Sequence, residues 1–181
     1  MQHVKDELNV FRKIVIAKAK QNLSKKSNTG NLSKSITSNL EVYQSGNFLL
    51  EFDLGEYGEF VDKGVKGAAP SQVSKNAKIK GQQAPNSPYK FRNKRPPSKP
   101  LEDWAKKKNV RLRSKDGKFA KGSYKTIGMI LAKNIWARGL KPSLFFTKPF
   151  ESEFKQLSNE LVEAFGLDID EFLQYTLNKY E

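Results

Sequence analysis

A 34-residue run from Val65 to Ser98 places the strongest constraint on what this chain can fold into. It reads VKGAAPSQVSKNAKIKGQQAPNSPYKFRNKRPPS and is rich in Pro, Gly, Ser, Gln and Lys. Its sizeable apolar residues are Val65, Val73, Ile79, Tyr89 and Phe91. A segment of this length without regular structure is uncommon inside a compact domain and is usually functional or disordered. We therefore expect a long basic extended arm beside a separate folded body.

The positive charge of the chain is concentrated in and just after this run. Residues 66–125 hold 18 Lys and Arg and three acids, a net of +15, whereas the other 121 residues hold 15 bases and 16 acids. Such a segment attracts nucleic-acid phosphates, an acidic protein surface or an anionic membrane alike. The pattern predicts a nearly neutral body with a cationic segment, and it leaves the partner open.

The near absence of Cys and His restricts the chemistry that the chain can support. There is no Cys, so disulfides and thiolate sites are excluded, and the single His is His3. No run approaches the roughly 20 apolar residues of a membrane span, and the first residues lack the apolar block of a signal peptide. We expect a soluble protein made in a cytoplasm, with no cofactor and no membrane partner.

Two periodic segments precede residue 55. Val4, Leu8, Phe11 and Val15 recur every three or four residues, which predicts an amphipathic helix from about 3 to 24. Partial alternation, with QSGN at 44–47, predicts antiparallel strands at about 33–44 and 47–54. A lone hairpin is marginally stable, so this one should pack on the first helix or pair with further strands.

The C-terminal half favours helices. Caps and apolar spacing predict helices at about 98–109, with Ser98 as N-cap, and at 123–138, with Gly139 as C-cap. Prolines predict an extended chain after 140, with 144–146 as a candidate strand. A helix at about 148–165 should end at Gly166, and Asp168 should cap a second terminal helix.

Five acids near the middle of the chain are the candidates for a metal or general acid–base site. They are Glu51, Asp53, Glu56, Glu59 and Asp62. Their spacing does not match a loop of consecutive oxygen ligands, and a solvated strand face and turn is the better interpretation. The serines at 24, 27, 33 and 35 have no His or other obvious general base to activate them, and GVKG lacks the P-loop spacing. We predict that the chain is not an enzyme and has no catalytic, cofactor-binding or metal residues.

Nucleic-acid binding is the main alternative suggested by the basic segment. Aromatic and basic residues are interleaved there, and this mixture can stack on bases and neutralise phosphates. It equally suits a solvated loop whose aromatic residues anchor it to the body or to a neighbouring subunit. The candidate contact residues are Lys78, Lys80, Tyr89, Lys90, Phe91, Arg92, Lys94 and Arg95.

Three motifs in order carry a family resemblance. TGNLSKSI at 29–36, YGEFVDKG at 57–64 and FFTKPFESEF at 145–154 resemble the pattern of the tail-completion, or head–tail joining, family of neck proteins of tailed bacteriophages. The matching positions are Thr29, Gly30, Leu32, Ser35, Ile36, Tyr57, Gly58, Phe60, Val61, Gly64, Pro149 and Phe150.

The resemblance implies an α+β subunit with a small curved antiparallel sheet packed against a long N-terminal helix and C-terminal helices. Residues 1–64 and 123–165 would form this core. The sequence departs from the short members of the family in the basic arm, assigned to 65–122 with a short helix at 98–109, and in a helical extension at 166–181. The resemblance also implies a virion protein assembled in the host cytoplasm. Its role would be that of an adaptor, a tail-completion ring or a tail terminator in the neck. Its partners would be other copies in a ring, the portal or adaptor, tail proteins and DNA in the channel, with no small-molecule substrate.

The stretch EYGEFVDKGVKG at 56–67 reads as the corner from which the basic segment departs. We expect Tyr57, Phe60 and Val61 to hold the end of the sheet to the helices. Gly58 and Gly64 should supply backbone freedom. Asp62 and Lys63 should stay solvated or meet a neighbouring subunit.

Overall fold

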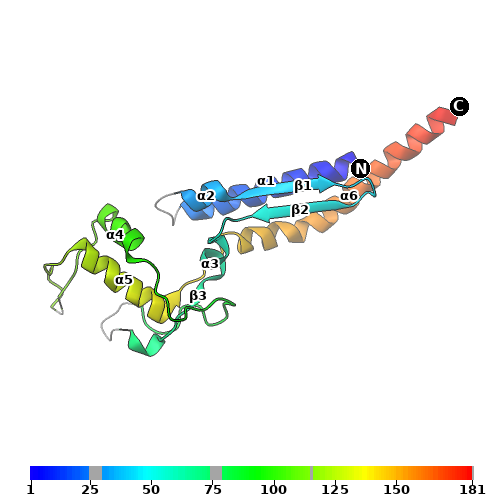
Figure 1. Cartoon of the computed structure of the whole chain (residues 1–181). Coiled ribbons are helices and arrows are strands. Elements are labelled where there is room, and N and C mark those ends of the chain that lie inside the picture. Colours follow the sequence, from blue (N-terminus) through cyan, green and yellow to red (C-terminus); the bar gives the residue numbers. More distant parts are fainter. Residues whose placement is uncertain (25–29, 74–78, 115, 181) are drawn as a thin grey trace. The chain divides into compact units, whose positions relative to one another are not determined.

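The computed structural model describes residues 1–24, 30–73, 79–114 and 116–180. The chain divides into two compact units (Figure 1). The first unit contains Met1–Gly58 and Leu144–Glu181, and the second unit is Glu59–Ser143. The predicted α+β class is confirmed, with an antiparallel sheet of two strands and long N-terminal and C-terminal helices. No helix in the described ranges is both long enough and apolar enough to cross a bilayer.

The first unit is built from two long helices and a hairpin. Helix α1 spans Gln2–Ser24, α2 spans Asn31–Ser35, and α6 spans Thr147–Tyr180. Strands β1 (Thr37–Val42) and β2 (Phe48–Asp53) pair antiparallel, with Thr37 opposite Asp53 and Val42 opposite Phe48. In Figure 1 the hairpin lies along α1 and α6.

The core of the first unit joins all three of these elements. The apolar side of α1 is buried, as its periodicity predicted; its buried residues are Val4, Leu8, Phe11, Val15, Ala19 and Leu23. Leu157 and Ala164 of α6 complete the buried cluster, and one face of the hairpin packs on it through Leu40, Phe48, Leu50 and Phe52. The rings of Phe11, Phe52 and Phe150 meet edge to face, with centroids 5.8–6.3 Å apart.

Three local predictions for the first unit were wrong. Residues 31–35 form the helix α2 and not the start of a strand, and residues 144–146 are coil and turn. The two terminal helices are one continuous helix, α6, which runs through Gly166 without a break. A glycine inside a helix costs only about 1 kcal/mol relative to alanine. Packing of Ala164 against α1 and of Asp168 against the start of α1 outweighs that cost.

The second unit contains short elements around a helix pair. Its elements are α3 (Gly58–Lys63), which begins at the boundary, β3 (Val65–Lys66), the 3-10 turn η1 (Pro70–Gln72), α4 (Ser98–Lys107), α5 (Tyr124–Arg138) and β4 (Gly139–Leu140). Helix α4 packs against α5, and β3 pairs antiparallel with β4. Residues 123–143, assigned above to the core of the first unit, therefore belong with the basic segment.

The ends of α5 follow the prediction, whereas the start of α4 does not. Ser123 caps α5, since its Oγ accepts the N–H of Thr126 at 3.2 Å, and Gly139 ends the helix at φ 93°. The cap of α4 is Pro97 in extended conformation, and Ser98 is the first helical residue. Helix α4 comes so close to α5 that a Cβ on Gly128 would lie 2.7 Å from the carbonyl oxygen of Ser98.

Candidate interaction surfaces

The segment predicted to be an extended arm is hydrogen-bonded into the second unit. Lys66 donates its N–H to the carbonyl of Tyr89 at 2.8 Å, and its own carbonyl accepts the N–H of Phe91 at 2.9 Å. The buried hydroxyl of Ser87 donates to the carbonyl of Gly64 at 2.7 Å. The expectation of an arm that leaves the body is corrected here, because β3 satisfies backbone groups that the segment cannot satisfy alone.

Tyr89 anchors this segment to α3. Its ring meets Phe60 edge to face, with centroids 4.5 Å apart, and its hydroxyl donates to the carboxylate of Glu59. That hydrogen bond raises the pKa of Tyr89. Phe60 was predicted to hold the sheet to the helices, but it contacts Tyr89 instead. Tyr57, which was predicted to do the same, is exposed.

Trp136 of α5 holds the other end of the segment. Its Nε1 donates to the carbonyl of Arg92 at 2.6 Å, and the guanidinium of Arg95 lies 5.3 Å from the centre of its ring. Tyr89 and Trp136 therefore anchor the two ends of the basic segment.

The basic candidate residues lie at the surface of the second unit. The side chains of Lys80, Lys90, Arg92, Lys94 and Arg95 are all exposed, whereas Phe91 is half-buried. Lys78 lies outside the described residues. These five exposed cations could contact a partner. Arg95 also contacts the ring of Trp136.

A second basic surface, which sequence reasoning treated only as a loop, surrounds Phe119. Arg113 and Phe119 form an antiparallel bridge that closes a turn at Gly117. The guanidinium groups of Arg111 and Arg113 lie 5.6 and 4.7 Å from the centre of the exposed Phe119 ring. Asp116-Gly117 flanked by basic residues was the signal that could have indicated this hairpin.

Charge is segregated between the two units. Residues 59–143 contain 22 Lys and Arg and five acids, a net of +17, whereas the first unit contains 11 bases and 14 acids, a net of −3. The predicted cationic segment is therefore a folded cationic unit. Its field favours anionic partners over all others.

The family-motif positions in the first unit are structural. Leu32 and Ile36 are buried, and the Ser35 hydroxyl donates to the carbonyl of Leu32 at 3.0 Å. Gly30 adopts φ 70° before α2, while Thr29 lies outside the described residues. Pro149 is buried in the first turn of α6, and Phe150 joins the aromatic core; Gly58 donates its N–H to the carbonyl of Gly55 at 3.1 Å.

The motif positions in the second unit fix the turn after α3. Gly64 has φ 72°, and a Cβ there would lie 2.5 Å from the carbonyl oxygen of Leu140, so the position requires glycine. The carbonyl of Val61 accepts both the N–H and the hydroxyl of Ser143, at 3.1 and 2.8 Å. Asp62, expected to be solvated or to meet a neighbouring subunit, is instead buried within this chain, at 2% exposure.

The remaining acids considered above for chemistry have structural partners or face solvent. Asp53 accepts the N–H of Gly55 at 2.8 Å, and Glu59 lies 3.8 Å from the Lys63 ammonium. Glu51 and Glu56 are exposed. In the part of the chain that the structure describes, three other residues bring potential metal-ligand atoms within 4.8 Å of one another: His3, Asp168 and Glu171.

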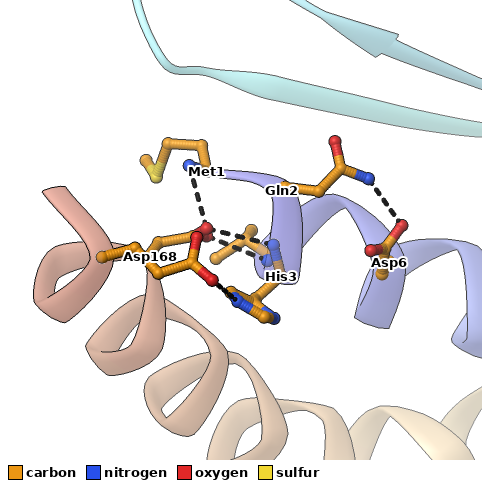
Figure 2. A network of polar contacts seen from close by, with 7 residues as sticks. Met1, Gln2, His3, Asp6 and Asp168 are labelled. Atoms are coloured by element: carbon orange, nitrogen blue, oxygen red, sulfur yellow. Dashed lines mark hydrogen bonds and ion pairs between the residues drawn. The ribbon is translucent and has the colours of Figure 1, made fainter. Parts of the chain in front are cut away.

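That group is occupied by internal contacts (Figure 2). The buried carboxylate of Asp168 accepts the N–H groups of His3 and Val4, each at 3.1 Å, and lies 2.9 Å from the amino group of Met1. Burial opposes ionisation of Asp168, but these donors outweigh it and lower its pKa to about 2. His3 Nε2 lies 2.8 Å from Glu171, and this hydrogen bond raises the pKa of His3.

The C-terminal part of α6 leaves an apolar surface exposed. In Figure 1 the end of α6 runs on past the N-terminal end of α1. We call the exposed apolar residues on one side of this part the tail stripe; they are Val162, Phe165, Ile169, Phe172, Leu173 and Leu177. Val162 and Phe165 also line a shallow apolar groove of about 350 Å³ together with Met1, Val4 and Phe48. A patch of this kind is a candidate interaction surface.

Comparisons of this chain with protein-family models, with curated proteins and with solved structures found no match.

Proposed function

We propose that this chain is a structural subunit of a bacteriophage neck, which forms a ring that joins the portal or adaptor of the head to the tail. The tail stripe carries the proposal, because a subunit that exposes this much apolar surface is completed by a neighbour. Val162 is 74% exposed and Phe172 is 67% exposed. The resemblance of the three motifs to phage neck proteins suggests that this neighbour is another subunit of a neck ring.

Particle composition is the decisive measurement. We expect mass spectrometry of virions from the phage that encodes this chain to find it in stoichiometric, multi-copy amounts. Immunogold labelling should place it between head and tail. Its absence from purified particles would overturn the proposal, even if the isolated protein formed oligomers.

Solution measurements test self-association separately. Sedimentation velocity over a wide concentration range should show a shift from monomer to larger species. A subunit that assembles only on a portal template would stay monomeric in this experiment. For that reason the particle measurement, and not the solution measurement, decides between a neck component and another role.

A second candidate function, binding of DNA or RNA, is favoured by the net charge of +17 on the second unit. The chain should then bind duplex DNA, and the affinity should fall as the salt concentration rises. A plot of log affinity against log salt concentration should have a slope of about −0.9 for each phosphate that the protein neutralises. Failure to bind near physiological salt would exclude this function. Deletion of residues 66–97 is not a clean test, because it removes Lys66 of β3 together with its hydrogen-bond partners Tyr89 and Phe91.

Point substitutions provide the clean test of nucleic-acid binding. Replacing exposed Lys90, Arg92 and Lys94 by Gln keeps the carbonyl of Arg92 that Trp136 uses. We expect this variant to bind DNA more weakly and with a smaller salt slope. The matched control replaces Lys5, Lys13 and Lys34, which are exposed in the first unit, and should bind as the parent does. Equal losses in both variants would show that binding follows net charge and not the second unit.

A further inference from the structure

The tail stripe combines apolar contact with negative charge. Each of its residues lies three or four positions from another one, so they share one side of α6. Residues 160–180 contain five acids and one base, Lys179. Of these acids, Glu163 and Asp170 are exposed and are seven residues apart, which places both along one border of the stripe. A partner for this surface should therefore present apolar side chains bordered by cations.

Helix α5 presents a surface of that kind in the second unit. Met129 and Ile130 are exposed apolar residues at the middle of the helix. Lys125 and Lys133 are also exposed, and they lie one turn before and one turn after Met129 on the same side. We call these four residues the α5 face. It is small and apolar at its centre, basic at both ends, and part of a unit with a net charge of +17.

We propose that the tail stripe of one copy binds the α5 face of a second copy. The inference rests on the proposed ring and names the surfaces that would build it. Pairing of two tails would bring like negative charges together, and pairing of two cationic units would be opposed more strongly. When the tail stripe pairs with the α5 face, burial of apolar surface and attraction between opposite charges both favour the contact.

The pairing of two different surfaces has a consequence for assembly. Each copy donates one tail stripe and offers one α5 face, so the contact is head to tail. Repetition of such a contact generates a closed ring when the rotation closes and an open filament when it does not. A symmetric dimer, in contrast, would need one surface to pair with itself.

Disulfide trapping tests the contact directly, because the chain has no Cys of its own. One preparation carries Leu173→Cys and a second, differently tagged, carries Met129→Cys. We expect the mixture to form a disulfide between the two tags under mild oxidation. The control replaces Met129→Cys by Ser71→Cys, an exposed position elsewhere in the second unit, and should give little product.

Each alternative occupant has its own outcome in this experiment. Efficient homodimers of Leu173→Cys alone would show that tails pair with each other. A chain that carries both cysteines and closes within itself at high dilution would show an internal contact. Equal trapping of Met129→Cys and Ser71→Cys would show random collision. Any of these outcomes, or no trapping at all, overturns the proposal.

Charge reversal provides an independent test. We expect Glu163→Lys with Asp170→Lys, and separately Lys125→Glu with Lys133→Glu, each to weaken association by about tenfold or more. Mixing the two variants should restore it, because opposite charges again face each other at the mixed contact. The matched control, Glu51→Lys with Glu56→Lys, changes the first unit by the same charge at exposed positions and should have little effect.

The failure of this contact and the failure of the neck proposal can be distinguished. If the chain is present in virions but charge reversal and trapping fail, the ring uses other surfaces and the proposed function stands. If trapping succeeds but the chain is absent from virions, the contact is real and the assembly is of another kind.

Discussion

Asp168 in the middle of α6 caps the first turn of α1, since its Oδ2 accepts the backbone N–H of Val4 at 3.1 Å across 164 residues of sequence. The first N–H groups of a helix lack partners within the helix itself. Here a side chain from a different helix supplies the acceptor that an N-cap residue usually provides. The contact therefore joins the two long helices of the first unit at a defined register.

Removal of this carboxylate should destabilise the first unit. We expect Asp168→Ala to lower the free energy of unfolding by about 1–3 kcal/mol, because the buried N–H of Val4 and the half-buried N–H of His3 lose their acceptor. Urea denaturation followed by circular dichroism measures the change. The matched control is Glu160→Ala, an exposed acid on the same helix, with an expected change within about 0.5 kcal/mol. Equal effects of the two substitutions would contradict the capping role.

The same carboxylate predicts a pH dependence of stability. Its pKa in the folded protein is about 2, which lies below the value of about 3.9 for an unfolded Asp. The stabilisation is therefore complete above about pH 4 and is lost as the pH falls toward 2. Urea midpoints measured from pH 6 to pH 2.5 should fall more steeply for the parent than for Asp168→Asn. Parallel curves for the two proteins would show that Asp168 does not contribute.

Gly166 tests whether α6 is one helix. Its position has no positive φ, and a Cβ there meets no atom within 4 Å. In a continuous helix, Gly166→Ala should raise the free energy of unfolding by about 0.5–1 kcal/mol, because alanine has the higher helix propensity. A helix break at this position would instead make alanine neutral or destabilising. Thermal unfolding of the two proteins at the same concentration distinguishes these results.

Gly64 should resist replacement by alanine at the turn after α3. Gly64→Ala forces a Cβ against Leu140 and Pro142 at φ 72°, and we expect a loss of about 2–4 kcal/mol in stability. Gly117→Ala is the matched control, because its φ of 77° is similar while no atom lies within 4 Å of the added Cβ. Its expected loss is about 1 kcal/mol. Similar losses at the two positions would show that conformation alone, and not the approach of β4, governs Gly64.

Local patterns predicted the elements whose stability depends on short-range order. The apolar spacing from Val4 to Val15 predicted α1, and the Ser123 and Gly139 signals bounded α5. The hairpin was recognised, although α2 replaced its first residues. The predictions failed where one local sequence signal is compatible with two different structures. Gly166 reads as a helix stop in sequence, but a helix held on its neighbour tolerates a glycine.

Only part of the candidate surfaces was predicted from the sequence, because here too one local signal is compatible with two structures. The exposed cations from Lys80 to Arg95 could be named from composition. The contacts of Tyr89 and Trp136 could not be predicted from composition. An aromatic residue in a polar segment can either pack against the rest of the protein or stack on a nucleic-acid base. The α5 face was not predicted, because apolar spacing along a helix does not show which apolar side chains find a neighbour, and Met129 and Ile130 are exposed.

The sequence by itself determined the long N-terminal helix, the hairpin and the location of the excess positive charge, because these follow from local periodicity and composition. The α+β class was implied by the resemblance of the three motifs. Only the tertiary structure decided that the basic segment is part of a folded unit and that Asp168 caps α1. The physical reason is that backbone polar groups must find partners wherever they are buried. Which partner they find depends on segments distant in sequence, as Lys66 and Tyr89 show.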